Sequence, residues 1–308
     1  MKEKDKSVKR TSLKTKIKAA FARKSKQEII TICVITPILL CWALSLVYPF
    51  LWALMNTFKT PSDFLRDSFA LPKELNFQNW IDAFSVLQVS KTNLTKAGVV
   101  EMIINSVWWM FGQVAISTFV TLLASYALAK YPFKFGKFLY IFNIIIMAIP
   151  IVGSMPAQYS LYHSLKIVNT PLMLVISAGC IGSSALMIYY SYFQNISWSY
   201  AEAVFIDGGG HWTVFFKIML PQAMPITSAM VILACIGSWN DYMTPLLYLP
   251  DYPTLATGLY KMSSETTTAN NKPMYFAAIL VSALPMFAIF MIFQEKIMTS
   301  VSIGGLKG

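Results

Sequence analysis

Residues 29–55 contain no charged side chain and consist mostly of large apolar residues. Roughly 20 such residues in a helix are enough to cross the hydrocarbon core of a bilayer. The whole chain is 56% hydrophobic and 13% charged, whereas about a quarter of the residues of a soluble domain are charged. The chain is therefore expected to be an integral membrane protein.

Six apolar segments separated by polar loops predict an all-α polytopic membrane protein with six transmembrane helices. An even number of crossings places both termini on one side. The predicted spans are residues 29–55, 102–129, 138–155, 171–193, 226–249 and 273–293. The predicted domains are a basic tail (1–27), a six-helix transmembrane domain (28–295) and a C-terminal tail (296–308).

The distribution of Lys and Arg gives the orientation. Residues 1–27 hold 11 of the 25 Lys and Arg residues, which favours a membrane topology signal over a nucleic-acid site. The segments on the side of the termini carry 17 of these residues, against 8 in the longer loops opposite. Because positive charge accumulates in cytoplasmic loops, both termini and residues 199–225 are predicted to be cytoplasmic.

Residues 199–225 form the longest segment after residue 101 that resembles neither a span nor an outer loop. Ser199 and Glu202 have the spacing of a capping box, which predicts a helix start. A short helix is expected up to residue 206, then a turn at Asp207 and the three glycines 208–210. A second short helix is expected over 212–220, ending at Pro221. Such a helical hairpin is a candidate docking element.

Several kinds of chemistry have no motif in the sequence. No phosphate-binding GxxxxGK[ST] pattern is present, and neither are HExxH, GxSxG or paired catalytic carboxylates. The chain is therefore not expected to be an enzyme, to bind a metal or to bind a cofactor of its own. Asp241 is the one ionisable residue inside the predicted spans, which argues against a carrier driven by an ion gradient. The four cysteines lie in apolar runs and are interpreted as buried thiols: Cys33, Cys41, Cys180 and Cys235.

The hairpin resembles the EAA loop of binding-protein-dependent ABC importer permeases. That pattern is E-A-A, three residues, G, nine residues and I-x-L-P. Glu202-Ala203-Val204 stands for E-A-A, Gly208 for the glycine, and Ile218 to Pro221 for the end. Val204 departs from the usual alanine. The six-span layout, Trp239-Asn240, Pro245 and the residues 303–308 resemble the carbohydrate permeases related to the smaller maltose-transporter permease.

The resemblance implies a function and an assembly. The chain would be the permease subunit of an ATP-driven sugar or oligosaccharide importer in the bacterial cell membrane, working by alternating access. Its partners would be a second permease, two ATPase subunits that bind ATP and magnesium, and an extracytoplasmic solute-binding protein. The EAA loop would dock in an ATPase cleft. The residues implied in coupling are Glu202, Ala203, Asp207, Gly208, Ile218, Leu220 and Pro221.

A polar and aromatic cluster near the end of the fifth span is the candidate substrate path. Aromatic rings stack on sugar rings, and amides or carboxylates bond to hydroxyl groups, but Trp and Tyr also mark membrane interfaces. The cluster consists of Trp239, Asn240, Asp241 and Tyr242. Asn105, Trp108, Trp109 and Gln113 in the second span form a second candidate group. His211 is interpreted as a polar surface residue.

Three alternatives remain at this point. The first is an ABC permease for a polyamine, a phosphate or an amino acid. The second is an ion-coupled secondary carrier working alone. The third is a membrane scaffold without a transport role, which the EAA spacing disfavours as it does the second.

Overall fold

The computed structural model describes residues 25–149, 153–179, 181–264 and 270–305. At the outer ends of the first and last helices, residues 26–27, 29–30, 293 and 295–305, it describes only the backbone. The chain divides into two compact units, Met1–Leu75 and Asn76–Gly308.

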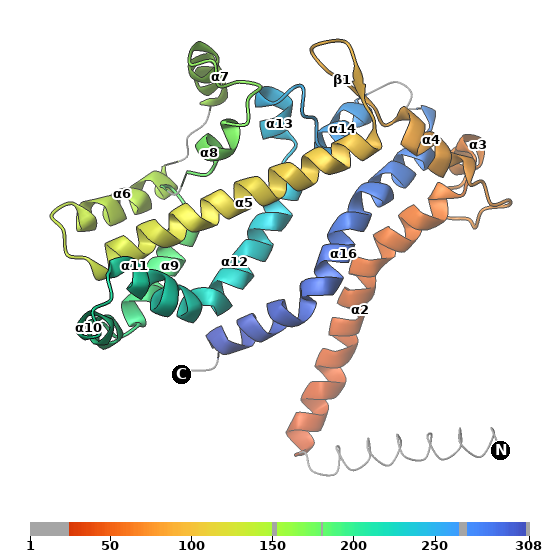
Figure 1. The fold of residues 1–308 in the computed structure, drawn as a ribbon. Coiled ribbons are helices and arrows are strands. Elements are labelled where there is room, and N and C mark those ends of the chain that lie inside the picture. The colour runs from red at the N-terminus through yellow and green to blue at the C-terminus, as the bar shows by residue number, and fades with distance from the viewer. Residues whose placement is uncertain (1–24, 150–152, 180, 265–269, 306–308) are drawn as a thin grey trace, which may run out of the picture. The chain divides into compact units, whose positions relative to one another are not determined.

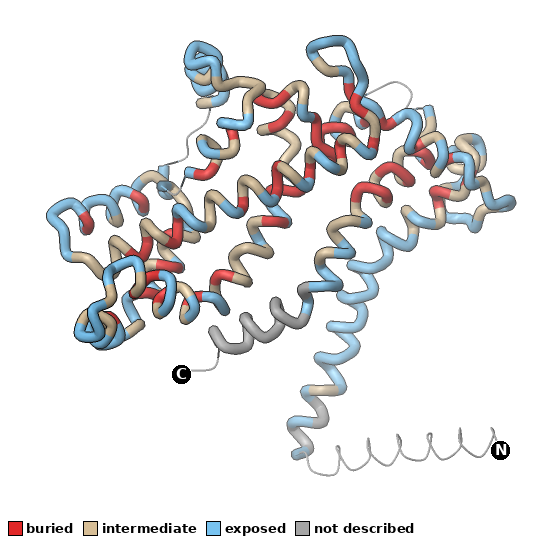
Figure 2. The backbone as a smooth tube through the Cα atoms, in the orientation of Figure 1, coloured by how far each residue is buried: buried red, intermediate tan, exposed pale blue. Residues whose placement is uncertain are grey.

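The described part of the first unit is dominated by α2 (Lys26–Thr57), which covers the whole of the predicted span 29–55. The helix begins with a capping box, in which Ser25 Oγ accepts from the Glu28 amide and Glu28 accepts from the Ser25 amide. Pro37 and Pro49 lie within the helix without ending it. Most apolar side chains of α2 are exposed (Figure 2). A short helix, α3 (Pro61–Arg66), follows.

Cys33 and Cys41 correct the prediction of buried thiols, because both are exposed on α2. Apolar side chains in a membrane helix need not be covered by their own chain, since lipid also excludes water from them. Cys235 is buried as predicted. Cys180 lies outside the described residues.

The second unit is built around α5 (Val99–Lys130), which runs the length of this unit (Figure 1). It packs against α8 (Met173–Ser177), α9 (Ser184–Asn195) and α12 (Leu220–Asn240). The helix α12 also packs against α16 (Lys272–Gly305). The buried residues of this unit lie mainly where these helices contact one another (Figure 2).

Within the described residues, four helices are long and apolar enough to cross a membrane: Thr31–Thr57, Val99–Lys130, His211–Asn240 and Lys272–Ile292. They match the first, second, fifth and sixth predicted spans. The first half of predicted span 138–155 is a shorter apolar helix, α6 (Gly136–Ala148). The chain is therefore mostly helical, as predicted.

Three predicted spans are not single helices. Pro156, in the first turn of α7 (Met155–Ser164), starts a new helix after α6. The predicted span 171–193 is divided into α8 and α9, with Gly182 in the left-handed region at φ +81°. The predicted span 226–249 ends early because α12 stops at Asn240, and α13 (Met243–Tyr248) follows.

The described parts of the predicted outer loops contain short helices and strands. The segment before α5 contains α4 (Gln78–Val86) and a small antiparallel pair, β1 (Val89–Ser90) and β2 (Lys96–Ala97), with Val89 opposite Ala97. The loop before α16 contains α14 (Leu255–Ser263), which packs on α5 and α16. Asp251 joins two of these loops, since it accepts from the Thr92 amide at 2.7 Å and from Asn169 Nδ2 at 2.6 Å.

Candidate functional site

The hairpin lies at the end of the second unit where α5 finishes (Figure 1). Its first arm is α10 (Ser199–Ile206), which has Trp198 as its N-cap residue and no side-chain cap. The predicted capping box at Ser199 is therefore wrong. Ser199 is already inside the helix, and its hydroxyl lies 2.7 Å from that of Ser197. Glu202 is left with an exposed side chain.

The turn of the hairpin is a Schellman motif. The Gly209 amide donates to the Val204 carbonyl at 2.8 Å, and the Gly208 amide donates to the Phe205 carbonyl at 3.1 Å. These bonds satisfy carbonyls at the end of α10 and require a left-handed residue after the cap. Gly208 supplies it at φ +81°. Asp207 is the C-cap residue, which agrees with its predicted place in the turn.

The second arm differs from the predicted short helix. It begins as α11 (His211–Val214), passes through one π-helical turn, η1 (Phe215–Met219), and continues into α12. Pro221 does not end it, because it lies in the first turn of α12 directly after the π-helical turn. π-turns loosen the ladder of backbone hydrogen bonds, and a proline cannot donate one. The arm is thus continuous with a membrane-length helix.

A buried cluster holds the hairpin to the helical body. Val214, Phe215 and Met219 on the second arm and Ala201 on the first are each no more than 1% exposed. They pack against residues of α5 and α9, which are Leu122, Tyr126, Tyr189 and Phe193. A displacement of the hairpin must therefore move these helices as well, because close-packed interiors transmit displacement.

A second set of contacts fixes the turn. The Tyr131 hydroxyl lies 2.8 Å from His211 Nδ1, and the two rings are 5.4 Å apart. The Trp198 ring packs on Tyr131 at 5.8 Å, and Phe205 packs on His211 at 5.0 Å. His211 is exposed, as predicted for a polar surface residue, and its ring in addition connects the hairpin to Tyr131 directly after α5.

The outer side of the hairpin exposes large apolar side chains. Ile206 is 86% exposed, Trp212 61% and Phe216 46%. The Trp212 and Phe216 rings stack with centroids 5.8 Å apart. Of the residues implied in coupling, Glu202, Ala203, Asp207, Gly208 and Pro221 are exposed, whereas Ile218 and Leu220 are half-buried. The hairpin thus combines an acidic residue with an uncovered apolar surface, which is typical of an interaction site.

The residues of the candidate substrate path occupy separate environments. Trp239 is 6% exposed within a core cluster, and Asn240 donates to the Ile236 carbonyl at 2.8 Å. Asp241 accepts from the Thr244 amide at 3.0 Å. Tyr242 stacks on Tyr260 at 4.5 Å, and Asn105 Nδ2 donates to the Pro253 carbonyl at 3.1 Å.

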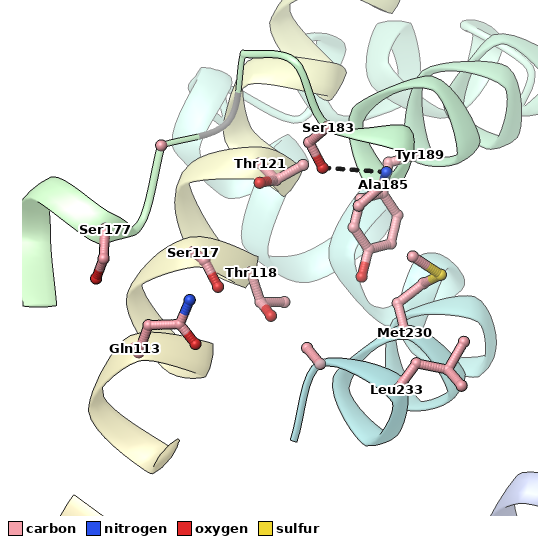
Figure 3. A pocket seen from close by; sticks show the side chains of 12 residues that line it. Gln113, Ser117, Thr118, Thr121, Ser177, Ser183, Ala185, Tyr189, Met230 and Leu233 are labelled. Carbon is pink, nitrogen blue, oxygen red and sulfur yellow. Dashed lines mark hydrogen bonds between the residues drawn. The ribbon is translucent and has the colours of Figure 1, made fainter. Parts of the chain in front are cut away.

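A polar cavity of about 270 Å³ lies elsewhere, between α5, α9 and α12 and beside the end of α8 (Figure 3). Its lining includes Gln113, Ser117 and Thr121 on α5 and Tyr189 on α9. None of the residues 239–242 lines it, nor does Asn105. The signal in the sequence is the spacing of Gln113, Ser117 and Thr121, which are four residues apart and so share one face of a helix.

The chain matches a family model described as binding-protein-dependent transport system inner membrane component, over residues 120–302. The arabinooligosaccharides transport system permease protein AraQ of Halalkalibacterium halodurans is 30% identical, covering 85% of this chain and 91% of the relative. The diacetylchitobiose uptake system permease protein NgcG of Streptomyces coelicolor is 26% identical, covering 88% and 87%. The melibiose/raffinose/stachyose import permease protein MelC of Bacillus subtilis is 28% identical, covering 84% and 91%.

A solved structure shares the fold. It is a bacterial ABC transporter involved in the import of the acidic polysaccharide alginate, and the alignment has a TM-score of 0.69 at 19% sequence identity. The alignment covers 88% of this chain and 98% of the chain in that solved structure.

Proposed function

The chain belongs to the family of binding-protein-dependent transport system inner membrane components, and on this premise we propose that it is the permease subunit of an ATP-driven importer of sugars or oligosaccharides. The observation that carries the proposal is its similarity along most of its length to permeases for several different oligosaccharides. The carbohydrate part of the proposal rests on the cargoes in the names of these relatives, which are all oligosaccharides.

The hairpin is the part of the chain proposed to receive the work of ATP hydrolysis. Its uncovered apolar side chains, Ile206, Trp212 and Phe216, would enter a cleft on an ATPase subunit. Glu202, one helical turn before Ile206 on α10, would pair with a basic residue there. The chain has no phosphate-binding loop, so ATP and magnesium are bound by the partner. The continuous helix His211–Asn240 connects this surface directly to the membrane region.

The proposed topology has six crossings with both termini and the hairpin in the cytoplasm. The third crossing is made by α6 with the segment after it, and the fourth by α8 and α9 together. The excess of Lys and Arg in the terminal segments supports this orientation. Broken helices are compatible with a crossing when the interrupted backbone is covered by protein or lines a cavity.

The proposed mechanism is alternating access. Closure of the ATPase dimer moves the hairpins of this chain and of a second, related permease, so that the membrane cavity opens outward to receive solute from a binding protein. Hydrolysis of ATP resets the assembly. The buried cluster around Phe215 couples hairpin displacement to α5 and α9, and Trp239, Asn240, Asp241, Tyr242 and Asn105 remain candidates for the solute path.

The test is uptake by the assembled complex in proteoliposomes. Labelled raffinose, maltotriose and arabinotriose are compared with spermidine, phosphate and an amino acid, with ATP or with an ion gradient alone. ATP-dependent uptake of a neutral oligosaccharide is expected. Uptake of only a non-sugar solute would overturn the carbohydrate assignment, and uptake driven by an ion gradient without ATP would overturn the importer class.

The docking role of the hairpin is tested with a matched pair of variants. Glu202→Ala is expected to reduce co-purification with the ATPase, because it removes the exposed carboxylate. Ser199→Ala is the control on the same helix, since the Ser199 side chain makes no cap hydrogen bond. Equal ATPase recovery with both variants would contradict the docking role of Glu202.

A further inference from the structure

The cavity between α5, α9 and α12 lies where the helical path of the chain is interrupted. α8 ends at Ser177 and α9 begins at Ser184, and both Ser177 and Ser183 line the cavity. The buried side chain of Asn143 accepts from the Gly182 amide at 2.7 Å and from the Ser183 amide at 3.3 Å. Interrupted backbone at membrane depth is tolerated where it lines a polar cavity, and such breaks mark solute sites in transporters.

The cavity is lined with uncharged groups that can both donate and accept hydrogen bonds. Gln113, Thr118 and Thr121 present an amide and two hydroxyls, and their side chains make no hydrogen bond to any described residue. Among the described residues that line the cavity, none is Asp, Glu, Lys, Arg or His. Opposite them Met230 and Leu233 form an apolar wall (Figure 3).

Tyr189 closes one side of the cavity. Its side chain is 1% exposed, and its hydroxyl is buried beside that of Thr227 on α12. Figure 3 shows the Tyr189 ring between the cavity-lining residues of α9 and Met230. The groups open to a solute are therefore those of α5, Gln113, Thr118 and Thr121.

We propose that this cavity is a binding site for one neutral, hydroxyl-rich ring of the solute, an inference that rests on the carbohydrate import proposed above. Hydroxyl groups of the ring complement Gln113, Thr118 and Thr121, and its C–H face packs on Met230 and Leu233. The volume of about 270 Å³ is near the lower limit of small-molecule pockets, about 300–1,000 Å³, so it admits a single ring. A longer solute passes ring by ring.

The same lining excludes charged rings. A carboxylate or ammonium group placed in the cavity loses its hydration and meets no opposite charge, which is strongly unfavourable. The cavity therefore discriminates glucose from glucuronate, two rings of nearly equal size. This selectivity is a property of this chain and is separate from that of any solute-binding protein.

The inference is tested by cysteine labelling in the fully assembled complex. The four native cysteines are replaced, and Thr118→Cys is compared with Val120→Cys on the same helix, whose side chain is outside the cavity. A water-soluble thiol reagent is expected to label Thr118→Cys several-fold faster. D-glucose, D-galactose and L-arabinose are then added, with glucuronate as the charged counterpart of glucose.

At least one neutral sugar is expected to slow labelling of Thr118→Cys several-fold, whereas glucuronate leaves it unchanged. If Thr118→Cys is labelled and none of the three sugars slows the labelling, the cavity holds water only, and the proposal is overturned. Equal protection by glucuronate overturns it too, as does labelling no faster than at Val120→Cys. If no sugar slows the labelling but ATP-driven uptake of oligosaccharides is intact, only this site is overturned. If a sugar slows the labelling but the complex takes up no oligosaccharide, only the proposed function is overturned.

Two side-chain variants refine the assignment. Gln113→Leu removes an amide that lines the cavity, and protection is expected to need roughly 2- to 12-fold more sugar, as for the loss of one hydrogen bond. Tyr190→Phe is the control, because Tyr190 does not line the cavity and its hydroxyl accepts from Gln194. An equal effect of both variants would contradict a contact between Gln113 and the sugar.

Discussion

The hydroxyl of Tyr131 lies 2.8 Å from Nδ1 of His211 and joins the end of α5 to the start of the second arm of the hairpin. Because the two residues are 80 positions apart, the bond fixes the hairpin relative to α5, the helix that contributes Gln113, Ser117, Thr118 and Thr121 to the cavity. The hairpin is therefore held at two levels, by its buried cluster and by this link at its tip.

The link between Tyr131 and His211 is expected to contribute about 0.5–1.5 kcal/mol, the usual net value of a hydrogen bond. A double-mutant cycle with Tyr131→Phe and His211→Phe, read by unfolding of the purified complex, isolates this coupling while ring packing is kept. Tyr140→Phe is the control, since the Tyr140 hydroxyl makes no hydrogen bond to a described residue. Additive losses in the cycle would show that the bond contributes nothing.

The three glycines of the turn are predicted to be unequal. Gly208→Ala forces a side chain into the left-handed region, which costs about 1–2 kcal/mol. Gly209→Ala places a Cβ 2.5 Å from Val204 Cγ1 and 3.0 Å from the Val204 carbonyl oxygen, so the end of α10 must shift. Gly210→Ala meets no atom within 4 Å and is the matched control.

ATPase co-purification and hydrogen exchange of the hairpin amides measure this series. The variants at 208 and 209 are expected to lose ATPase and to exchange faster, while the variant at 210 resembles the native chain. A loss at 210 as large as that at 208 would show that the turn geometry does not decide docking.

The long membrane helices and the existence of the hairpin could be predicted because apolar length and glycine position are local signals. The capping box shows the limit of such signals. The same S-x-x-E pattern forms a box at Ser25 but not at Ser199. At Ser199 the helix starts one residue earlier, where Trp198 packs on Tyr131 and Phe205. The contact with Tyr131 joins distant parts of the chain, which no local pattern contains.

The break between α8 and α9, and with it the cavity, could not be predicted for the same reason. No proline marks it, and the side chain that supports it, Asn143, comes from another helix. The polar residues of the cavity are likewise shared among α5, α8 and α9, so no single stretch of sequence is unusually polar. In the sequence, only α5 gives a sign of the cavity, through Gln113 of the second candidate group and its four-residue spacing to Ser117 and Thr121.

Asn143→Ala is predicted to destabilise the chain by about 1–3 kcal/mol, because the amides of Gly182 and Ser183 lose their acceptor. The structural consequence is local, so the cavity should become disordered at its α9 edge before the whole chain unfolds. Thermal unfolding of the complex and labelling at Thr118→Cys measure the two effects. Ile144→Ala, on the exposed face of the same helix, is the control, and equal losses would contradict a specific role for Asn143.

The outer loops are predicted to loosen at low pH through Asp251. Hydrogen bonds from the Thr92 hydroxyl, from Asn169 and from the Thr92 amide lower the pKa of the Asp251 carboxyl below its ordinary value. A lowered pKa in the folded state means that the carboxylate stabilises the loops above the unfolded pKa of about 3.9. This stabilisation is lost as the pH falls through the lower folded pKa.

Hydrogen exchange of residues 89–97 and 169–171 between pH 7 and pH 3, corrected for the intrinsic pH dependence of exchange, should therefore show increased opening only at the acidic end. Asp251→Asn should show the open behaviour at both ends of the range, and a native pH profile in that variant would exclude Asp251 as the responsible group.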